Sequence, residues 1–215
     1  MRTVFVTGGT GYIGRPLIAA LLERGESVHA LVRHGSEHKL PSGAAAVVGD
    51  ALDASTFTAA IPRGATVVHL VGTPHPNPSK AAEFERVDLQ SIRATASAAR
   101  EAGAGHVVYV SVAHPAPIMH AYIAARSAGE TLVRATGLPA TILRPWYVLG
   151  PGHYWPYLLL PMYAVLRHLP STRDTARRLG LVRRGEMVRA LVHAVLNPPS
   201  GVRIVEVPEI AASLR

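Results

Sequence analysis

The glycine-rich segment Gly8–Gly14 constrains the fold more than any other part of the chain. A short β-branched and apolar run, Thr3–Thr7, precedes it, and an apolar-periodic segment, Tyr12–Arg24, follows at once, which predicts a strand, a tight turn and a helix. Three of its residues have the G-x-G-x-x-G spacing of a dinucleotide-binding turn: Gly9, Gly11 and Gly14. Such glycines let the backbone approach a pyrophosphate and let the helix pack closely on the strand. The helix start would turn N–H groups and the positive end of its dipole toward the phosphates.

The rest of the chain alternates between strand-like and helix-like patterns. Strands are predicted at Thr3–Thr7, Ser27–Arg33, Ala46–Val48, Thr66–Val71, His106–Ser111, Ala140–Leu143 and Val202–Val207. Helices are predicted at Tyr12–Arg24, Ala54–Ala60, Ala81–Ala102, Met119–Ala135, Trp155–His168 and Glu186–Leu196. This alternation predicts an α/β protein with a doubly wound parallel sheet. We expect a dinucleotide-binding core over residues 1–144 and a small substrate-side cap over 145–215, interleaved with the core in a single domain.

The composition excludes several classes of protein. With 215 residues, 48% apolar and 17% charged, the chain is long and apolar enough to fold around a core. It has no cysteine, which excludes disulfides, thiolate zinc sites and cysteine nucleophiles. The sequence begins with a core strand rather than a signal peptide. Its longest membrane-like run, residues 157–166, contains Pro161 and is too short to cross a bilayer. We therefore expect a soluble, cytoplasmic protein.

The net charge of +8 is concentrated in the arginine-rich segment 167–189. This segment is interpreted as a solvated face, with an anionic membrane or nucleic acid as the alternative partner. No nucleic-acid motif accompanies it, so we expect no nucleic-acid partner. Of the eleven histidines, His34 and His38 have helical i, i+4 spacing, but Gly35 and Ser36 between them disfavour a helix. We therefore expect no metal site.

Arg33 decides the type of dinucleotide that we expect. A site for NAD usually has an acidic residue at the end of the second strand, where it binds the ribose 2′-hydroxyl. Here Arg33 stands at that end, and a guanidinium suits a 2′-phosphate, so NADP(H) is favoured over NAD(H). The alternative is a surface arginine without a ligand. Asp50 is expected to accept a hydrogen bond from the adenine amino group, whereas Asp53 fits a helix cap better.

Several residues are predicted to line the cofactor. They lie in the glycine turn and after the ends of successive predicted strands, where ligands bind in open parallel sheets. They are Gly8, Thr10, Gly11, Tyr12, Ile13, Gly14, Arg33, Asp50, Ala51, Val71, Gly72, Pro145 and Val148.

Two motifs together give a family resemblance. The turn resembles T-G-x-x-G-x-x-G, counted on Gly8, Gly11 and Gly14, and Arg144–Gly152 resembles the R-P-x-x-x-x-G-P-G loop beside the nicotinamide. Over residues 1–152 the chain is similar to the short-chain dehydrogenase/reductase superfamily, in its extended or atypical branch. The resemblance implies a Rossmann core that binds NAD(P).

The resemblance also implies candidate catalytic residues. The family uses a Tyr as acid/base, a Lys four residues later and a Ser at the end of the fifth strand. Tyr122 and Ser111 match, but Arg126 replaces the Lys, and Asp88 stands where many relatives carry an Asn. The i, i+4 spacing places Tyr122 and Arg126 on one helix face, where a cation favours the phenolate.

The sequence therefore predicts an enzyme, an NADP(H)-dependent oxidoreductase or an epimerase-type enzyme acting on an apolar carbonyl or alcohol. The alternative is a non-catalytic dinucleotide-binding redox sensor or assembly subunit, with Tyr122 and Arg126 as a helix-surface pair. The aromatic segment 146–166 has three interpretations: the wall of an apolar substrate pocket, part of the core, or a surface that docks another protein or a membrane. Its aromatic and methionine side chains include Trp146, Tyr147, Trp155, Tyr157, Met162 and Tyr163.

Overall fold

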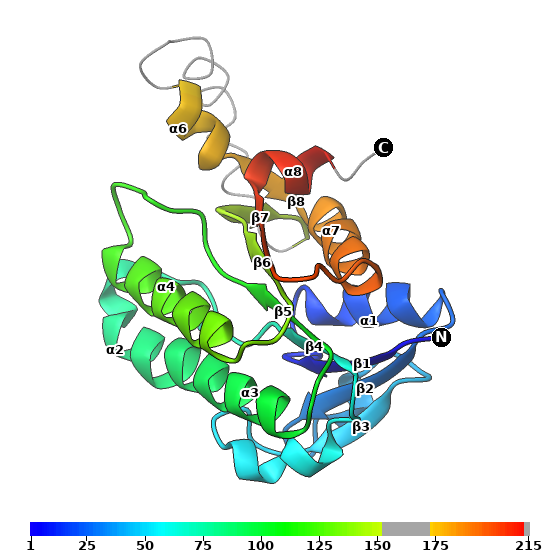
Figure 1. The fold of residues 1–215 in the computed structure, drawn as a ribbon. Helices are drawn as coiled ribbons and strands as arrows, with labels where there is room; N and C mark the ends of the chain where they lie inside the picture. Colours follow the sequence, from blue (N-terminus) through cyan, green and yellow to red (C-terminus); the bar gives the residue numbers. More distant parts are fainter. Residues whose placement is uncertain (152–172, 213–215) are drawn as a thin grey trace.

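A seven-stranded sheet forms the centre of the computed structural model, which describes residues 1–151 and 173–212 (Figure 1). Its strands are β1 Thr3–Thr7, β2 Ser27–Val32, β3 Ala45–Val48, β4 Thr66–His69, β5 His106–Val110, β6 Ala140–Arg144 and β9 Val202–Glu206. The strand order is β3-β2-β1-β4-β5-β6-β9, and every neighbouring pair is parallel. The predicted doubly wound parallel α/β fold is confirmed.

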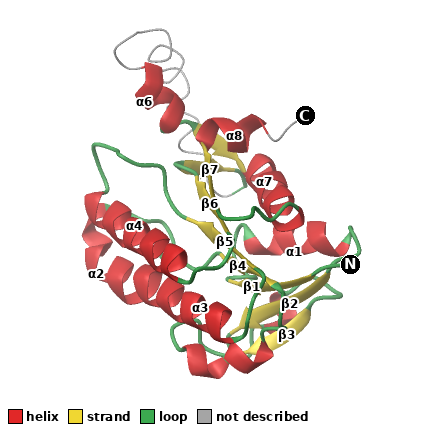
Figure 2. Cartoon of the chain, viewed as in Figure 1, coloured by secondary structure: helices red, strands yellow, loops and turns green. Residues whose placement is uncertain are grey.

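Helices cover both faces of this sheet (Figure 2). One face carries α1 Gly14–Leu22 and α7 Arg184–Leu196. The other carries the continuous helical segment of α2 Ala81–Glu83, the π-helical turn η5 Phe84–Leu89 and α3 Gln90–Glu101, beside α4 His120–Ala135. The remaining elements are short: η1 Glu37–Lys39, η2 Ala54–Thr56, η3 Thr58–Ala60, η4 Pro78–Lys80, β7 Tyr147–Leu149, α6 Arg173–Arg178, β8 Leu181–Arg183 and α8 Val207–Ala212.

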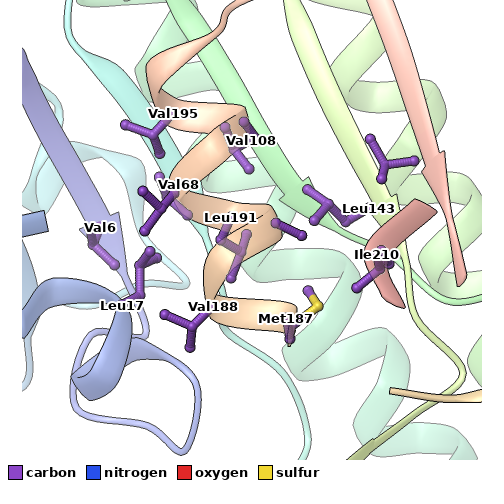
Figure 3. Close-up of a cluster of buried hydrophobic side chains, with 14 of the residues drawn as sticks. Val6, Leu17, Val68, Val108, Leu143, Met187, Val188, Leu191, Val195 and Ile210 are labelled. Carbon is purple, nitrogen blue, oxygen red and sulfur yellow. The ribbon is translucent and has the colours of Figure 1, made fainter. Parts of the chain in front are cut away.

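Alternation along the strands divides the core into two clusters. On β1, Val4 and Val6 face α1 and α7, whereas Phe5 faces the opposite helical layer. Figure 3 shows the first cluster, in which Leu191 of α7 lies over the strands. Because both sheet faces are covered, the central strands are nearly continuous apolar runs rather than alternating ones.

The order of the strands locates the binding crevice. From β1 the chain runs outward through β2 to β3, and it then returns to the other side of β1 to form β4. In open α/β sheets, ligands bind outside the carboxyl ends of the strands at such a reversal. The residues after β1 and β4 therefore form the centre of the candidate site.

Several predicted elements differ from those observed. The predicted helix Ala54–Ala60 is two separate 3₁₀ turns, η2 and η3, because Asp53 caps the first and the side chains of Thr56 and Thr58 bond to backbone carbonyls. The predicted helix Ala81–Ala102 is interrupted by η5 and ends at Glu101.

Other boundaries shift by a few residues. The predicted strand Thr66–Val71 ends at His69, and the predicted helix Tyr12–Arg24 starts at Gly14, because Gly11 to Ile13 form the turn. The loop predicted over 144–152 contains β7, which pairs with β8. The predicted helix Trp155–His168 lies outside the described residues.

The C-terminal segment supplies part of the core. β9 pairs with β6 at the edge of the main sheet, and α7 packs against α1. Of the segment 145–215, these two elements therefore belong to the sheet and its helical layer. The boundary at residue 144 and the cap role of the remainder stay predictions.

Candidate functional site

The predicted cofactor residues lie along one edge of the sheet. Because all seven strands are parallel, their carboxyl ends meet at that edge. The residues follow the strands in turn: Gly8, Thr10, Gly11, Tyr12, Ile13 and Gly14 after β1, Arg33 after β2, Asp50 and Ala51 after β3, Val71 and Gly72 after β4, and Pro145 and Val148 after β6. Ser111 follows β5 at the same edge.

The glycine turn is held by close backbone approaches. Gly8 has a left-handed φ of 76°, and a Cβ at this position would lie 2.8 Å from the carbonyl carbon of Leu70. The N–H of Gly11 donates to the carbonyl of Gly8 at 3.0 Å. A Cβ on Gly14 would overlap that same carbonyl oxygen. The turn therefore leaves no room for side chains at these glycines, and it sets the start of α1 directly over the end of β1.

A buried polar network fixes the strands below the turn. His69 of β4 is fully buried, and its Nδ1 lies 2.9 Å from the hydroxyls of both Thr7 and Thr95. Ser91 Oγ lies 3.4 Å from Nε2. Burial, together with the nearby Arg126 charge, lowers the pKa of His69 to about 3, so the ring is neutral at physiological pH. The residue before the glycine turn is thus tied to β4 and α3.

The residues predicted to bind the 2′-phosphate and the adenine of the cofactor lie at exposed positions. Arg33 directly follows the last residue of β2 and is exposed. Asp50 follows β3, and its Oδ1 accepts a hydrogen bond from the N–H of Leu52 at 2.9 Å. Asp53 caps η2 by accepting from the N–H of Ser55, as its position predicts. Arg33 and Asp50 thus flank the glycine turn on the β2 and β3 side.

Arg126 is the most constrained side chain of the predicted catalytic group. It is buried, and its Nη2 lies 2.7 Å from Oδ1 of Asp88. Its guanidinium carbon lies 5.2 Å from the ring centroid of Tyr122. Burial disfavours the charged form, but Tyr122, Tyr109 and Asp88 outweigh that effect and raise the pKa of Arg126. The interpretation of Tyr122 and Arg126 as a helix-surface pair is therefore wrong for Arg126, because the fold encloses its charge.

The Arg126 guanidinium joins the ends of two strands. Its Nη1 donates to the carbonyl of Val110, the last residue of β5, at 2.9 Å, and its Nη2 lies 3.5 Å from the carbonyl of Val71 after β4. A Cβ on Gly72 would overlap Nη2, so the glycine admits the guanidinium. Gly72 is predicted to line the cofactor, and its neighbour in the structure is Arg126.

Asp88 is held from two sides. Its Oδ2 accepts hydrogen bonds from the N–H and the hydroxyl of Thr73, at 3.0 and 2.6 Å. Its Oδ1 faces Arg126, and the whole residue is buried inside η5. The acid that replaces the family's Asn therefore pairs with the arginine that replaces its Lys.

Ser111 belongs to a second charged cluster. Its hydroxyl donates to Oε1 of Glu130 at 2.7 Å, and both residues are buried. Arg144 donates to both oxygens of Glu130, and Arg134 donates to one of them. Burial would raise the pKa of Glu130, but the hydrogen bonds from Arg144 and Ser111 outweigh it and lower this pKa to about 2. Glu130 is thus a carboxylate that holds the Ser111 hydroxyl.

Arg126 contacts both Tyr122 and the residue before Ser111. The Tyr122 ring is half-buried against Phe84, with centroids 5.0 Å apart, and lies over the guanidinium. That guanidinium also binds the carbonyl of Val110, which directly precedes Ser111. The structure therefore links Tyr122, through Arg126, to the end of the strand that Ser111 follows.

Sequence reasoning missed Glu130 and Arg184. Arg184, at the start of α7, has its guanidinium carbon 5.1 Å from the ring centroid of Tyr12 in the glycine turn. Glu130 lies four residues after Arg126, and this helical spacing could have indicated that the two share a helix face. No pattern in the nearby sequence links Arg184 to Tyr12.

Part of the predicted aromatic wall is described. Trp146 is partly buried against the first core cluster, and Tyr147 is half-buried in β7. Trp155, Tyr157, Met162 and Tyr163 lie outside the described residues. Over the parts of the chain that the structure describes, no helix combines the length and apolarity needed to cross a membrane, and no three potential metal ligands gather.

A parallel sheet whose order reverses beside a glycine turn, with a helix starting over that turn, defines a dinucleotide-binding α/β protein of the Rossmann type. The glycine turn and the helix start fit the pyrophosphate of a dinucleotide, since bulk is excluded there and N–H groups are presented. The model of the family described as NAD(P)H-binding matches residues 8–152. The chain belongs to that family.

Individual relatives agree with this assignment. A ceramide reductase from Caulobacter vibrioides is 34% identical over 177 residues, which cover 81% of this chain and 55% of the relative. The chain thus spans about half the length of this curated relative.

Solved structures show the same fold. The Bordetella bronchiseptica enzyme WbmH in complex with NAD+ superposes with a TM-score of 0.70 at 22% identity, covering 96% of this chain and 75% of that one. A short-chain dehydrogenase/reductase superfamily protein from Agrobacterium tumefaciens with bound NAD has a TM-score of 0.69 at 20% identity, covering 98% and 82%. The Rossmann fold that the resemblance implies is confirmed.

Proposed function

We propose that this chain is an NAD(P)-dependent oxidoreductase, with a preference for NADP(H), that acts on an apolar carbonyl or alcohol. One observation carries the proposal: the buried Arg126 guanidinium joins the Tyr122 ring to the strand end that bears Ser111, beside the glycine turn. The relative named as a reductase supports the same class of reaction.

Each residue has a separate role in this proposal. The nicotinamide, when bound, would supply or accept the hydride. Tyr122 exchanges the proton with the substrate oxygen, and Ser111 orients that oxygen. Arg126 holds the Tyr122 ring and the ends of β4 and β5 in position. Glu130 accepts the hydrogen bond from the Ser111 hydroxyl, which leaves the oxygen of Ser111 open to accept a hydrogen bond from an alcohol substrate.

A second function has its own support. Asp88 neutralises the charge of Arg126, and Glu130 accepts the hydrogen bond that the Ser111 hydroxyl would otherwise donate to a substrate. Both contacts favour a stable site that binds a dinucleotide without turning it over, as in a redox sensor or an assembly subunit. Such a protein would distinguish the oxidised from the reduced cofactor and show no turnover.

The Tyr122→Phe variant tests the proposal. Purified wild type is titrated with NADPH and NADH and assayed on a panel of apolar ketones and aldehydes. General acid–base catalysis contributes about 10²- to 10⁴-fold, so we expect kcat to fall by about that factor while the Kd for cofactor stays within about twofold. Turnover that is unchanged in Tyr122→Phe would remove Tyr122 from the mechanism. No turnover by wild type, with binding intact, would favour the sensor.

The expected location, docking surface and arginine-rich face remain proposals. A cytoplasmic location, and docking of another protein or a membrane through the segment 146–166, rest on the sequence. The interpretation of the arginine-rich segment as a solvated face also rests on the sequence, except at Arg184.

A further inference from the structure

The contact between Arg184 and Tyr12 joins the C-terminal part of the chain to the glycine turn. The Arg184 guanidinium carbon lies 5.1 Å from the Tyr12 ring centroid, within the range of a cation–π interaction. Tyr12 directly follows Gly11, and its backbone is part of the turn at the start of α1. A positive side chain from residue 184 thus contacts the side chain of a residue whose backbone leads into the start of α1.

The position of Arg184 is set by close packing from a third segment. A Cβ on Gly150 would overlap the Tyr12 hydroxyl and would lie 3.2 Å from the Arg184 Cβ. The end of β7, the start of α7 and the glycine turn therefore meet with no space between them. Arg184 is half-buried at this junction, whereas its neighbour Arg183 is exposed.

The charge of Arg184 is not neutralised by the carboxylate nearest in sequence. Glu186 accepts a hydrogen bond from the backbone N–H of Arg183 at 2.7 Å, and so caps the start of α7. Within residues 1–151 and 173–212, no carboxylate lies within ion-pair distance of Arg184. A half-buried cation in contact with a residue of the glycine turn favours an anionic ligand.

We infer that Arg184 binds the pyrophosphate of the dinucleotide from the side opposite the α1 N-terminus. This inference rests on the proposed dinucleotide binding and adds a residue from outside the glycine motif to that site. The guanidinium supplies forked donors that suit phosphate oxygens, and the Tyr12 ring orients it. The same chemistry would suit an anionic group of the substrate, which the experiment distinguishes.

The test uses the full chain and ADP-ribose, which has the pyrophosphate but no nicotinamide. Calorimetric Kd values for ADP-ribose and NADPH are compared in wild type, Arg184→Met, Arg184→Lys and Arg183→Gln. Met and Lys both keep an unbranched stem on Tyr12, and only Lys keeps the charge. We expect Arg184→Met to weaken both ligands about tenfold or more, since hydrogen bonds to charged groups are worth about 1.5–3 kcal/mol. Arg184→Lys should recover most of that loss, and Arg183→Gln should stay within about twofold.

Each other outcome overturns the inference. Equal affinities in Arg184→Met and wild type would exclude a pyrophosphate contact and would leave a substrate anion as the partner. An affinity in Arg184→Lys as low as that in Arg184→Met would show that a positive charge at position 184 is not what binds the pyrophosphate. A wild type that binds neither NADPH nor NADH would instead refute the proposed function, so the two failures are distinguishable.

Discussion

At the scale of single residues, the site is built from buried charges that compensate one another. Arg126 and Asp88 form one ion pair, and Glu130 accepts hydrogen bonds from Ser111 and Arg144. Breaking a buried pair by removing one partner leaves an uncompensated charge, which is strongly destabilising. The arginine in place of the family's lysine is therefore matched by an acid on a different helix, and the two departures form one structural unit.

Arg33 is the residue whose substitution tests the cofactor preference. If its guanidinium binds a 2′-phosphate, Arg33→Ala should raise the Kd for NADPH about tenfold or more and change the Kd for NADH less than about twofold. Fluorescence titration of the reduced cofactors measures both values. Arg63→Ala serves as the control, because Arg63 is also exposed but precedes β4 at the opposite edge of the sheet. Equal losses for NADPH and NADH would contradict the preference.

His69 makes the folded protein sensitive to acid. Burial lowers the pKa of His69 from its ordinary value of 6.5 to about 3, so the unfolded chain binds more protons than the folded protein between these pH values. The contribution of His69 is therefore fully present above pH 6.5 and is lost as the pH falls, by about 2 kcal/mol at pH 5. Urea unfolding at pH 7 and pH 5 should show a smaller difference for His69→Gln than for wild type. His193→Gln is the control, because His193 is exposed. If His69→Gln loses as much stability between pH 7 and pH 5 as wild type, His69 is not the source of the acid sensitivity.

At the scale of elements, the sequence predicts those strands and turns whose conformation depends on neighbouring residues. The strands were found because buried parallel strands are continuous β-branched runs, as in Val67-Val68. The glycine turn was found because its backbone requires glycine. The short strands β7 and β8 were missed, since three residues carry no usable period and their stability comes from pairing with each other.

The site shows the same division between local and distant information. Family spacing indicated Tyr122, Ser111 and Arg126, and the structure shows Arg126 in contact with the Tyr122 ring and with the carbonyl of Val110, the residue before Ser111. The sequence did not predict the partners of these residues. Asp88 is buried within the π-helical turn η5, a rare irregularity in an otherwise helical pattern. Arg184 reaches Tyr12 only through the packing of α7 on α1. Contacts between elements that lie far apart in sequence leave no local pattern to find.

At the scale of the whole molecule, one sheet face is completed by a helix from the far end of the chain. Leu191 of α7 shares a cluster with Val6 of β1 and Val108 of β5 (Figure 3). The N-terminal strands therefore cannot bury this face by themselves. We expect the described parts of the chain to unfold as one cooperative unit.

Leu191→Ala tests this cooperation. Removing a fully buried Leu should lower the free energy of unfolding by about 2–5 kcal/mol. Circular dichroism and tryptophan fluorescence should report the same single shifted transition. Val202→Ala on β9 is the control, because that side chain is 46% exposed and its loss should change stability by less than about 0.5 kcal/mol. Two separate transitions in Leu191→Ala would show that the C-terminal segment folds as a unit of its own.

The late position of α7 has a consequence for synthesis on the ribosome. Translation proceeds at about 5–20 residues per second, so β5 emerges several seconds before the helix that covers it. During that interval the nascent sheet presents Val6, Val68 and Val108 uncovered on one side. We expect such a chain to depend on chaperones while it is being made, and to acquire its nucleotide site only after Arg184 has left the ribosome.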